Sequence, residues 1–359
     1  MGVRVSRSRA FLASLGASIW LTGCSLWPAE SNPFTTTESS TDFGDAILDV
    51  YGMITWIVVV VGILVSALLV FTVLRFRDDG SPGNPKQIHG NTQLEVGWTL
   101  IPVVLVIFMI VPTVRTIFQV ADAAPDEAIE IRVVGKRWWW EFEYVEEGII
   151  TANEIHVPTG RPVSLLIESD SVIHSFWVPR LGGKRDAVPG RINRMWWTIQ
   201  DEIPAGEEIV YRGECAEYCG ESHALMRFDV VAHNEADYQQ WVELMKNPPA
   251  VADAAVRTAG EEAFAAGGCI GCHAVANIEG AESRIGPNLT RVGIRKRIAA
   301  GTLMNSSENL HDWIAEPEAV KPGTTEDQLG NPRFDGMVIP VELTDEQVDA
   351  LATYLSALQ

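Results

Sequence analysis

Cysteine is scarce in this sequence, and basic residues are outnumbered by acidic ones. The 359 residues include five cysteines, an odd number and too few for a disulfide scaffold, so each cysteine needs its own explanation. Lys and Arg number 27 against 47 Asp and Glu, a net charge of −20, which excludes a nucleic-acid-binding protein because such a surface repels phosphate. Charged residues make up 21% and hydrophobic residues 47%. This composition excludes intrinsic disorder, and the length favours two or three folding units.

Two long runs without charge stand in the first third of the chain. They are the 25 residues between Asp49 and Arg75 and the 19 residues between Glu95 and Arg115. Each is long enough to cross a bilayer, which takes about 20 residues. Both are apolar on all sides, which argues against a buried helix of a soluble core. We therefore expect a transmembrane hairpin over residues 49–118, with helices at about 50–74 and 95–117.

The linker between the two runs gives the orientation of the hairpin. It carries Arg75, Arg77 and Lys86, and the positive-inside rule places such a linker in the cytoplasm. Both ends of the hairpin then lie on the outer side. We expect a protein of the bacterial cytoplasmic membrane whose N- and C-terminal parts are periplasmic.

The N-terminus has the features of a targeting segment. Three arginines precede an uncharged run over residues 10–23, and 14 residues rise only about 21 Å as a helix, too little to span a membrane. The following sequence Leu-Thr-Gly-Cys24 resembles a bacterial lipobox. We expect a lipoprotein signal peptide at 1–23, lipid attached to Cys24 and a periplasmic tether over 24–48. The alternative is an ordinary signal peptide followed by a free cysteine.

Short strand-like runs separated by turn residues follow, which predicts an all-β sandwich or barrel over about residues 125–235. The end of this region holds soft metal ligands at close spacing: Cys215, Cys219, His223 and Met226. Thiolates, imidazole and thioether together suit copper. Zinc is the competing metal, but it leaves Met226 unexplained, and a disulfide would leave both His223 and Met226 without a role. His174 is the natural candidate for one more ligand.

The C-terminal part carries a second redox motif, Cys269-Ile-Gly-Cys272-His273. Cys-x-x-Cys-His is typical of a covalently attached c-type haem, with the imidazole bound to iron. A thioredoxin-like cysteine pair is the alternative, but no βαβ pattern surrounds this one. After a linker at 236–258, we expect an all-α haem domain at 259–359. Its last helix begins with a Thr344/Gln347 capping box and has an apolar stripe that includes Leu351 and Leu355.

The copper-ligand pattern resembles the CuA centre of cytochrome c oxidase subunit II, a family with a two-helix membrane hairpin and a cupredoxin domain. The resemblance covers roughly residues 45–245. It implies two copper ions bridged by both cysteines, with one histidine on each copper and two weak ligands. The implied ligands are His174, Cys215, Cys219, His223, Met226 and the backbone carbonyl of Glu217.

The same resemblance implies roles for three further side chains. Trp138 occupies the position that accepts electrons from cytochrome c, although it could equally be a core residue. Glu217 binds, through its side chain, a magnesium ion shared with subunit I. Glu95 matches the glutamate at the mouth of the K proton pathway, although a plain helix cap is the alternative. The remaining four histidines stand in no motif and are expected to be ordinary surface or turn residues: His89, His156, His233 and His311.

The haem region resembles class I cytochromes c. In that family a Gly-Pro-Asn-Leu loop, here residues 286–289, supports the proximal histidine, which is His273. A methionine just before the last helix is the second iron ligand. Met337 has this position, and Met304 is the other candidate.

The resemblance as a whole implies subunit II of a caa3-type cytochrome c oxidase with a fused cytochrome c. Electrons would pass from haem c to CuA and then to haem in subunit I, where oxygen is reduced to water and protons are pumped. The implied partners are subunits I and III, membrane lipid and a donor such as soluble cytochrome c, cytochrome bc1 or alternative complex III. Nitrous oxide reductase is excluded by the hairpin, and quinol oxidases lack the copper ligands. A CuA-type nitric oxide reductase remains the alternative.

Overall fold

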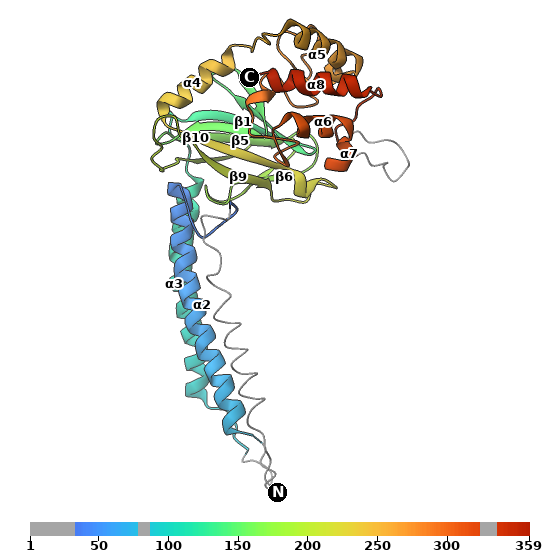
Figure 1. Ribbon diagram of the computed structural model, residues 1–359. Helices are drawn as coiled ribbons and strands as arrows, with labels where there is room; N and C mark the ends of the chain where they lie inside the picture. Colours follow the sequence, from blue (N-terminus) through green and yellow to red (C-terminus); the bar gives the residue numbers. More distant parts are fainter. Residues whose placement is uncertain (1–32, 78–86, 324–335) are drawn as a thin grey trace, which may run out of the picture.

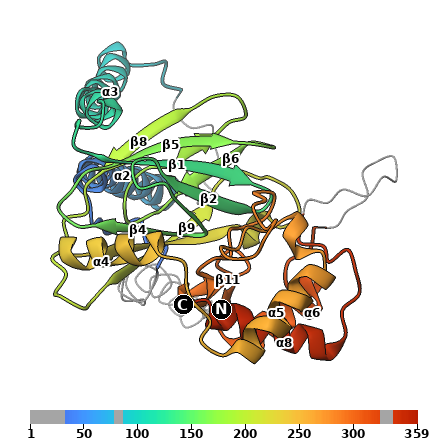
Figure 2. The same ribbon diagram turned by 90° about the horizontal axis from the view of Figure 1, so that it is seen from above.

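The computed structural model describes residues 33–77, 87–323 and 336–359. The predicted signal peptide, Cys24 and Lys86 lie outside the described residues. A helical hairpin extends from one side of a β sandwich, and a small helical domain lies against the sandwich (Figures 1 and 2). The predicted fold class is therefore confirmed: a two-helix membrane hairpin, an all-β cupredoxin-like domain and a helical C-terminal domain.

The hairpin consists of α2 (Asp42–Arg75) and α3 (Thr92–Ala121). Both helices are long and apolar enough to cross a membrane. Thr41 caps α2 by accepting a hydrogen bond from the amide of Gly44, and Asn91 caps α3 in the same way. The 34 residues of α2 correspond to about 51 Å of helix, more than the ~30 Å hydrocarbon core of a bilayer. Part of α2 must therefore lie outside the membrane.

The helix was expected to begin near residue 50, but α2 begins at Asp42, inside the segment expected to be a tether. The part of α2 outside the membrane accounts for this difference. Its first turn packs against the β domain, where the Phe43 and Trp196 ring centroids are 4.5 Å apart. The Thr41 hydroxyl donates to the carbonyl of Leu181 at 2.7 Å. A run without charge marks only the lipid-exposed part of a helix. The sequence therefore could not reveal the polar first two turns.

The β domain is a sandwich of two five-stranded sheets. One sheet has the order β3-β2-β1-β5-β8 and the other the order β4-β10-β9-β6-β7. The first sheet comprises β1 (Ile129–Lys136), β2 (Trp139–Tyr144), β3 (Ile149–Ala152), β5 (Val163–Ser169) and β8 (Asn193–Trp197), and the second β4 (Glu154–Pro158), β6 (His174–Trp177), β7 (Arg185–Ala187), β9 (Ile209–Cys215) and β10 (Arg227–His233).

Aromatic side chains fill the space between the sheets. Trp140, Phe142, Phe176 and Phe228 are almost completely buried and contact one another through their rings. Helix α4 (Glu235–Lys246) covers one end of this core with Tyr238, Trp241 and Val242. Residues 236–246 of the expected linker therefore pack against the β domain as a helix. The apolar residues of α4 recur at helical spacing, so they lie on one face of the helix and are buried by this packing.

Two of the histidines that were expected at the surface are buried. His156 and His233 are each 8% exposed, and their rings stack with Nδ1 of His156 2.8 Å from Nε2 of His233. Glu154 lies 2.9 Å from the other His156 nitrogen. Burial lowers the pKa of His233 to about 4. The expectation for this pair is wrong because β4 and β10, which carry them, pair in parallel, a long-range contact without a local sequence signal.

The C-terminal domain is built on α5 (Ala254–Ala266) and α8 (Asp345–Ala357), which pack against each other. The predicted Thr344/Gln347 capping box is present, and the predicted apolar stripe is buried against Phe264 of α5. Between these helices lie two shorter ones, α6 (Ser307–Ala315) and α7 (Pro317–Val320). The described part of the region also holds two 3-10 turns, η3 (Cys269–Gly271) and η4 (Val292–Ile294), and a small hairpin of β11 (Arg297–Ile298) and β12 (Leu303–Met304). The hairpin departs from the expected all-α domain.

The α5–α8 contact depends on a glycine, which leads to a stability prediction. A Cβ atom on Gly260 would lie 2.2 Å from Cβ of Tyr354, so a methyl group forces the two helices apart. We expect Gly260→Ala to lower the free energy of unfolding of the C-terminal domain by about 1–3 kcal/mol. Urea denaturation followed by circular dichroism checks this. The control is Gly271→Ala, where an added Cβ meets nothing within 4 Å, and equal losses in both variants would contradict the packing argument.

Candidate copper and haem centres

The candidate copper ligands come from two neighbouring strands and the loop between β9 and β10. Cys215 is the last residue of β9, and Cys219 lies in the loop. His223 begins the 3-10 turn η2 (His223–Leu225), and Met226 directly precedes β10. His174 is the first residue of β6, which pairs with β9 so that Phe176 is opposite Cys215. The sheet register therefore brings His174 to the loop from 41 residues away.

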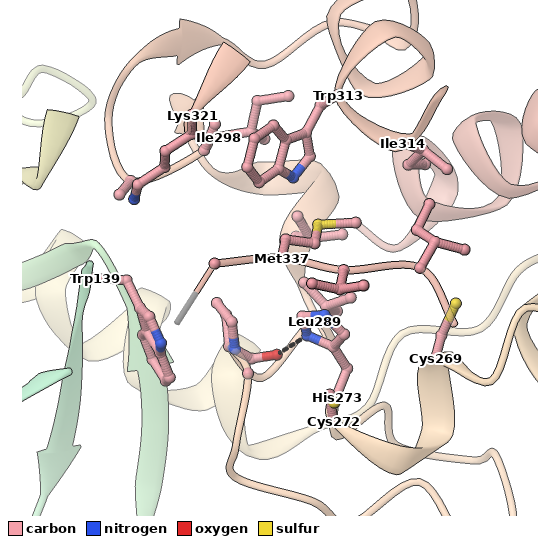
Figure 3. Close-up of a pocket in the computed structure, with 18 of the residues that line it drawn as sticks. Trp139, Cys269, Cys272, His273, Leu289, Ile298, Trp313, Ile314, Lys321 and Met337 are labelled. Carbon is pink, nitrogen blue, oxygen red and sulfur yellow. Dashed lines mark hydrogen bonds between the residues drawn. The ribbon is translucent and has the colours of Figure 1, made fainter. Parts of the chain in front are cut away.

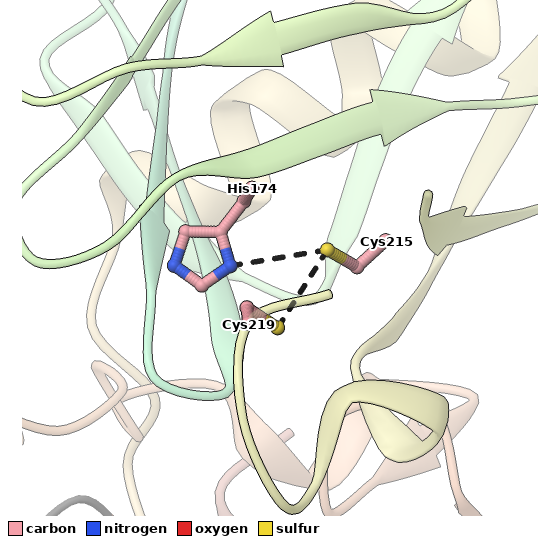
Figure 4. Close-up of side chains that lie close together, drawn as sticks. All are labelled: His174, Cys215 and Cys219. Carbon is pink, nitrogen blue, oxygen red and sulfur yellow. Dashed lines mark hydrogen bonds between the residues drawn. The ribbon is translucent and has the colours of Figure 1, made fainter. Parts of the chain in front are cut away.

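The side chains of His174, Cys215 and Cys219 converge on one point (Figure 4). The Sγ atoms of Cys215 and Cys219 are 3.8 Å apart. Nδ1 of His174 is 3.8 Å from Sγ of Cys215, and Nδ1 of His223 is 3.6 Å from Sγ of Cys219. The thioether sulfur of Met226 is 3.9 Å from Sγ of Cys219, and the Glu217 carbonyl oxygen is 3.2 Å from Sγ of Cys215. All six sequence-predicted donors are thus brought together.

The chemistry of this donor set fits copper. Both cysteines are free and buried, and each thiol has a histidine nitrogen beside it. Hydrogen bonds with Cys219 and then with His174 lower the pKa of the Cys215 thiol to about 3, which favours the thiolate that binds metal. The two cysteines with two imidazoles and a thioether form a soft set of the kind that selects copper. His174, Cys215 and Cys219 form a compact group of metal-binding side chains.

A glycine on the neighbouring sheet makes room for His174. A Cβ atom on Gly135 would lie 2.8 Å from Cδ2 of the His174 ring. The ring also packs edge-on to Trp140 at 5.9 Å between centroids. His174 itself is fully buried. Its orientation is therefore fixed by packing before any metal binds.

The haem-attachment motif lines a cavity of about 210 Å³ in the C-terminal domain (Figure 3). Cys269, Cys272 and His273 lie on its wall, together with apolar side chains such as Leu289 and Trp313. Nδ1 of His273 is 2.8 Å from the carbonyl oxygen of Pro287. Because a carbonyl can only accept, Nδ1 carries the proton and Nε2 is left free to bind iron. The expectation that residues 286–289 support His273 agrees with this bond.

The two candidate methionines differ in position. Met337 lines the same cavity as His273. Met304 is on β12, does not line this cavity and is 56% exposed. A thioether must enter the pocket to reach the iron, so the geometry favours Met337.

The haem domain and the copper domain meet through ionic contacts around buried carboxylates. Glu141 accepts a hydrogen bond from Arg284 at 2.7 Å, and Glu154 accepts one from the backbone amide of Lys296 at 2.8 Å. Asp229, 1% exposed, contacts Arg297 of the haem domain at 3.4 Å. Each carboxylate belongs to the copper domain and has a partner in the haem domain. Asp229 also accepts a hydrogen bond from Arg212 of its own domain at 2.6 Å. No local sequence pattern predicts the pairs between the domains, because their partners lie about 70 to 143 residues apart.

Trp138 contacts both candidate centres. It is 3% exposed, and its indole Nε1 donates to the carbonyl oxygen of Cys219 at 2.9 Å. The same side chain lines the haem cavity. Lys321 of the haem domain, which sequence reasoning missed, donates to the Trp138 carbonyl.

The other predicted site residues lie apart from this junction. Glu217 exposes its side chain at the surface of the copper loop. Glu95 is exposed in the first turn of α3, at the end of the hairpin far from the β domain (Figure 1). It is separated from the end of α3 by about 39 Å of helix.

A membrane-anchored cupredoxin domain joined to a c-type cytochrome domain is the class of protein that this fold and these sites define. Residues 31–116 match the family described as cytochrome C oxidase subunit II, transmembrane domain, and residues 147–233 match its periplasmic domain. Residues 258–359 match the cytochrome c family. These matches imply copper and haem c as cofactors.

Curated relatives agree over nearly the whole length. Cytochrome c oxidase subunit 2 of Alkalihalophilus pseudofirmus is 35% identical, with 97% of this chain and 96% of the relative covered. The Bacillus subtilis protein of that name is 34% identical, with 94% of each covered. The chain therefore belongs to the cytochrome c oxidase subunit II family, in the form with a fused cytochrome c domain. Its function is electron transfer through CuA to subunit I, as a subunit of the oxidase in the membrane.

Proposed function

We propose that electrons are received at the haem domain, pass to a two-copper CuA centre and continue to the haem of subunit I for reduction of oxygen to water coupled to proton pumping. The observation that carries this direction is the position of Trp138, which lines the haem cavity and donates a hydrogen bond to the carbonyl of Cys219. When bound, the copper and haem groups supply one-electron redox chemistry. The chain supplies the ligands and the contact between the two sites.

For the copper centre, we propose that Cys215 and Cys219 bridge the two metal ions. His174 and His223 each face a different thiol through Nδ1, which supports one histidine on each copper. Met226 and the Glu217 carbonyl approach the thiols from further directions and would be the weak ligands. Trp138 would be the residue through which the electron reaches this centre.

For the haem, we propose thioether attachment through Cys269 and Cys272, with His273 and Met337 as the iron ligands. The Nδ1–H of His273 donates to the Pro287 carbonyl, which holds the ring with Nε2 toward the cavity. The apolar side chains of the wall would keep water away from the iron of a bound haem. All four residues of this proposal line the same cavity.

Several parts of the proposal concern the surroundings of the chain. The exposed Glu217 side chain would bind a magnesium ion shared with subunit I. Subunit III and a donor (soluble cytochrome c, cytochrome bc1 or alternative complex III) would be further partners in the bacterial cytoplasmic membrane. Lipid attached at Cys24 would anchor the N-terminus on the periplasmic side. We place the copper domain at about residues 125–246, because α4 packs into its core.

The test is a spectrum and an oxygen-uptake measurement on the purified complex. We expect the signals of haem c and CuA, together with oxygen consumption supported by a reduced donor. Nitric oxide consumption without oxygen uptake would instead assign the complex to the CuA-type nitric oxide reductases, the alternative that the same electron route also permits.

The distance between Glu95 and the redox sites leads to a prediction. If Glu95 admits protons from the cytoplasmic side, Glu95→Ala slows oxygen uptake several-fold and leaves the copper and haem spectra unchanged, because its end of α3 is remote from both centres. Glu95→Asp retains a carboxylate and should keep more of the activity. Unchanged uptake and proton pumping in Glu95→Ala would show that the residue is a plain helix-end carboxylate.

A further inference from the structure

A three-residue segment of the haem domain, residues 321–323, lies at the junction of the two candidate centres. It directly follows α7 and carries Lys321, Pro322 and Gly323. We propose that this segment holds the haem domain at the separation from Trp138 that fast electron transfer requires, with Gly323 and Lys321 as positioning residues. The proposal rests on the electron route from haem to copper proposed above.

Gly323 approaches the Trp138 ring more closely than any side chain could. A Cβ atom at this position would lie 2.0 Å from Cζ3 and 2.8 Å from Cη2 of the indole, whereas real Cβ contacts essentially never fall below 3.0 Å. From the copper loop, a Cβ on Gly220 would lie 2.9 Å from Cζ2 of the same ring. Glycine backbones from both domains therefore lie against Trp138, and any larger residue at 323 would force the segment and the indole apart.

Two hydrogen bonds fix the segment to the copper domain, one to the turn between β1 and β2 and one to the copper loop. The Lys321 ammonium donates to the carbonyl of Trp138, and the Ser222 hydroxyl, fully buried beside His223, donates to the carbonyl of Pro322. Lys321 is itself 8% exposed and lines the haem cavity (Figure 3). Burying an ammonium is costly unless it is hydrogen-bonded. Its position therefore indicates a fixed contact between the two domains.

The other side of the segment lies against the chain that carries the candidate haem ligand. A Cβ atom on Gly336 would be 3.4 Å from the carbonyl carbon of Gly323, and Met337 follows Gly336. The same few atoms thus contact Trp138 on one side and the start of the Met337 segment on the other. A displacement of Gly323 would therefore change its contact with Trp138 and its contact with the segment that carries Met337.

The step that this contact serves transfers one electron. The haem iron is oxidised by one electron, the copper centre is reduced by one, and no bond forms or breaks. Since neither partner diffuses, the rate depends on how the two sites are positioned. Because no bond is made, a small displacement of the haem domain is expected to slow the transfer several-fold and not to stop it.

The experiment uses the whole oxidase complex and follows reoxidation of the haem after its rapid reduction. We expect Gly323→Ala to slow electron transfer to copper several-fold and Gly323→Val to slow it further, with haem absorption and the copper electron-spin signal intact. Lys321→Met should also slow transfer, and Lys321→Arg, which keeps a donor, should restore part of the rate. The control is Gly183→Ala, where a Cβ makes an ordinary 3.6 Å contact with Ile47.

The outcomes separate this inference from the electron route on which it rests. An unchanged transfer rate in Gly323→Val with both spectra intact overturns the role of the segment and leaves the route standing. Absence of haem-to-copper transfer in the unsubstituted complex overturns the route itself. If the Gly323 variants lose either signal, Lys321→Met decides, and an unchanged rate there contradicts the proposal.

Discussion

We expect Cys219→Ser to abolish the binuclear copper centre. The Cys219 sulfur is the point where three other donors meet, since the sulfurs of Cys215 and Met226 and Nδ1 of His223 lie within 3.6–3.9 Å of it. A serine hydroxyl is a poor ligand for copper and cannot bridge two ions as a thiolate does. The electron-spin signal of one spin shared by two coppers should be lost, and oxygen uptake with it.

The β sandwich should survive this substitution. The packed core of the domain consists largely of aromatic and aliphatic side chains from the strands, such as Trp140 and Phe228, and a hydroxyl is smaller than a thiol. Circular dichroism of the variant should therefore match that of the unsubstituted protein. Tyr218→Phe is the control in the same loop. Because Tyr218 is 75% exposed, this substitution should leave the copper signal unchanged. Stoichiometric zinc in place of copper in the unsubstituted protein would contradict the copper assignment.

The local motifs were enough to predict both candidate centres from the sequence. The copper loop keeps four donors within twelve residues, and the haem motif keeps three within five. His174 was also predicted as one more ligand, although no local spacing links it to the loop, since it is close only through the pairing of β6 with β9. Ligand chemistry imposes such short spacings, so a single sequence reveals them.

What the sequence did not reveal is the junction between the domains. The contact of Lys321 with Trp138 joins residues 183 positions apart, and the burial of His156 and His233 follows from a parallel strand pairing. The first contact depends on where the two domains meet, and the second on the pairing of two strands that are far apart in the sequence. Neither a periodic pattern nor a fixed spacing in the sequence predicts such contacts, because many different residue pairs can form them.

The second large effect is expected at the haem, where Met337→Ala should remove the methionine–iron bond. Met337 lines the cavity opposite the attachment motif, and Met304 is exposed on β12 outside it. Methionine ligation raises the potential of a histidine-ligated haem. Its loss should eliminate the weak near-infrared band of the ferric protein, lower the haem potential and slow reduction of the copper centre.

Haem attachment itself should persist in Met337→Ala, because Cys269 and Cys272 hold the porphyrin through covalent bonds, and the denatured protein should still stain for haem. Met304→Ala should keep both the band and the potential. A band that disappears in Met304→Ala and persists in Met337→Ala would assign the ligand to Met304. That outcome would require β12 to leave its pairing with Arg297 and turn its side chain into the cavity, a rearrangement that the present packing of the hairpin against the copper domain opposes. The backbone amide of Arg227 in β10 donates to the carbonyl of Ala300 at 3.0 Å, and this bond holds the turn between β11 and β12 against the copper domain.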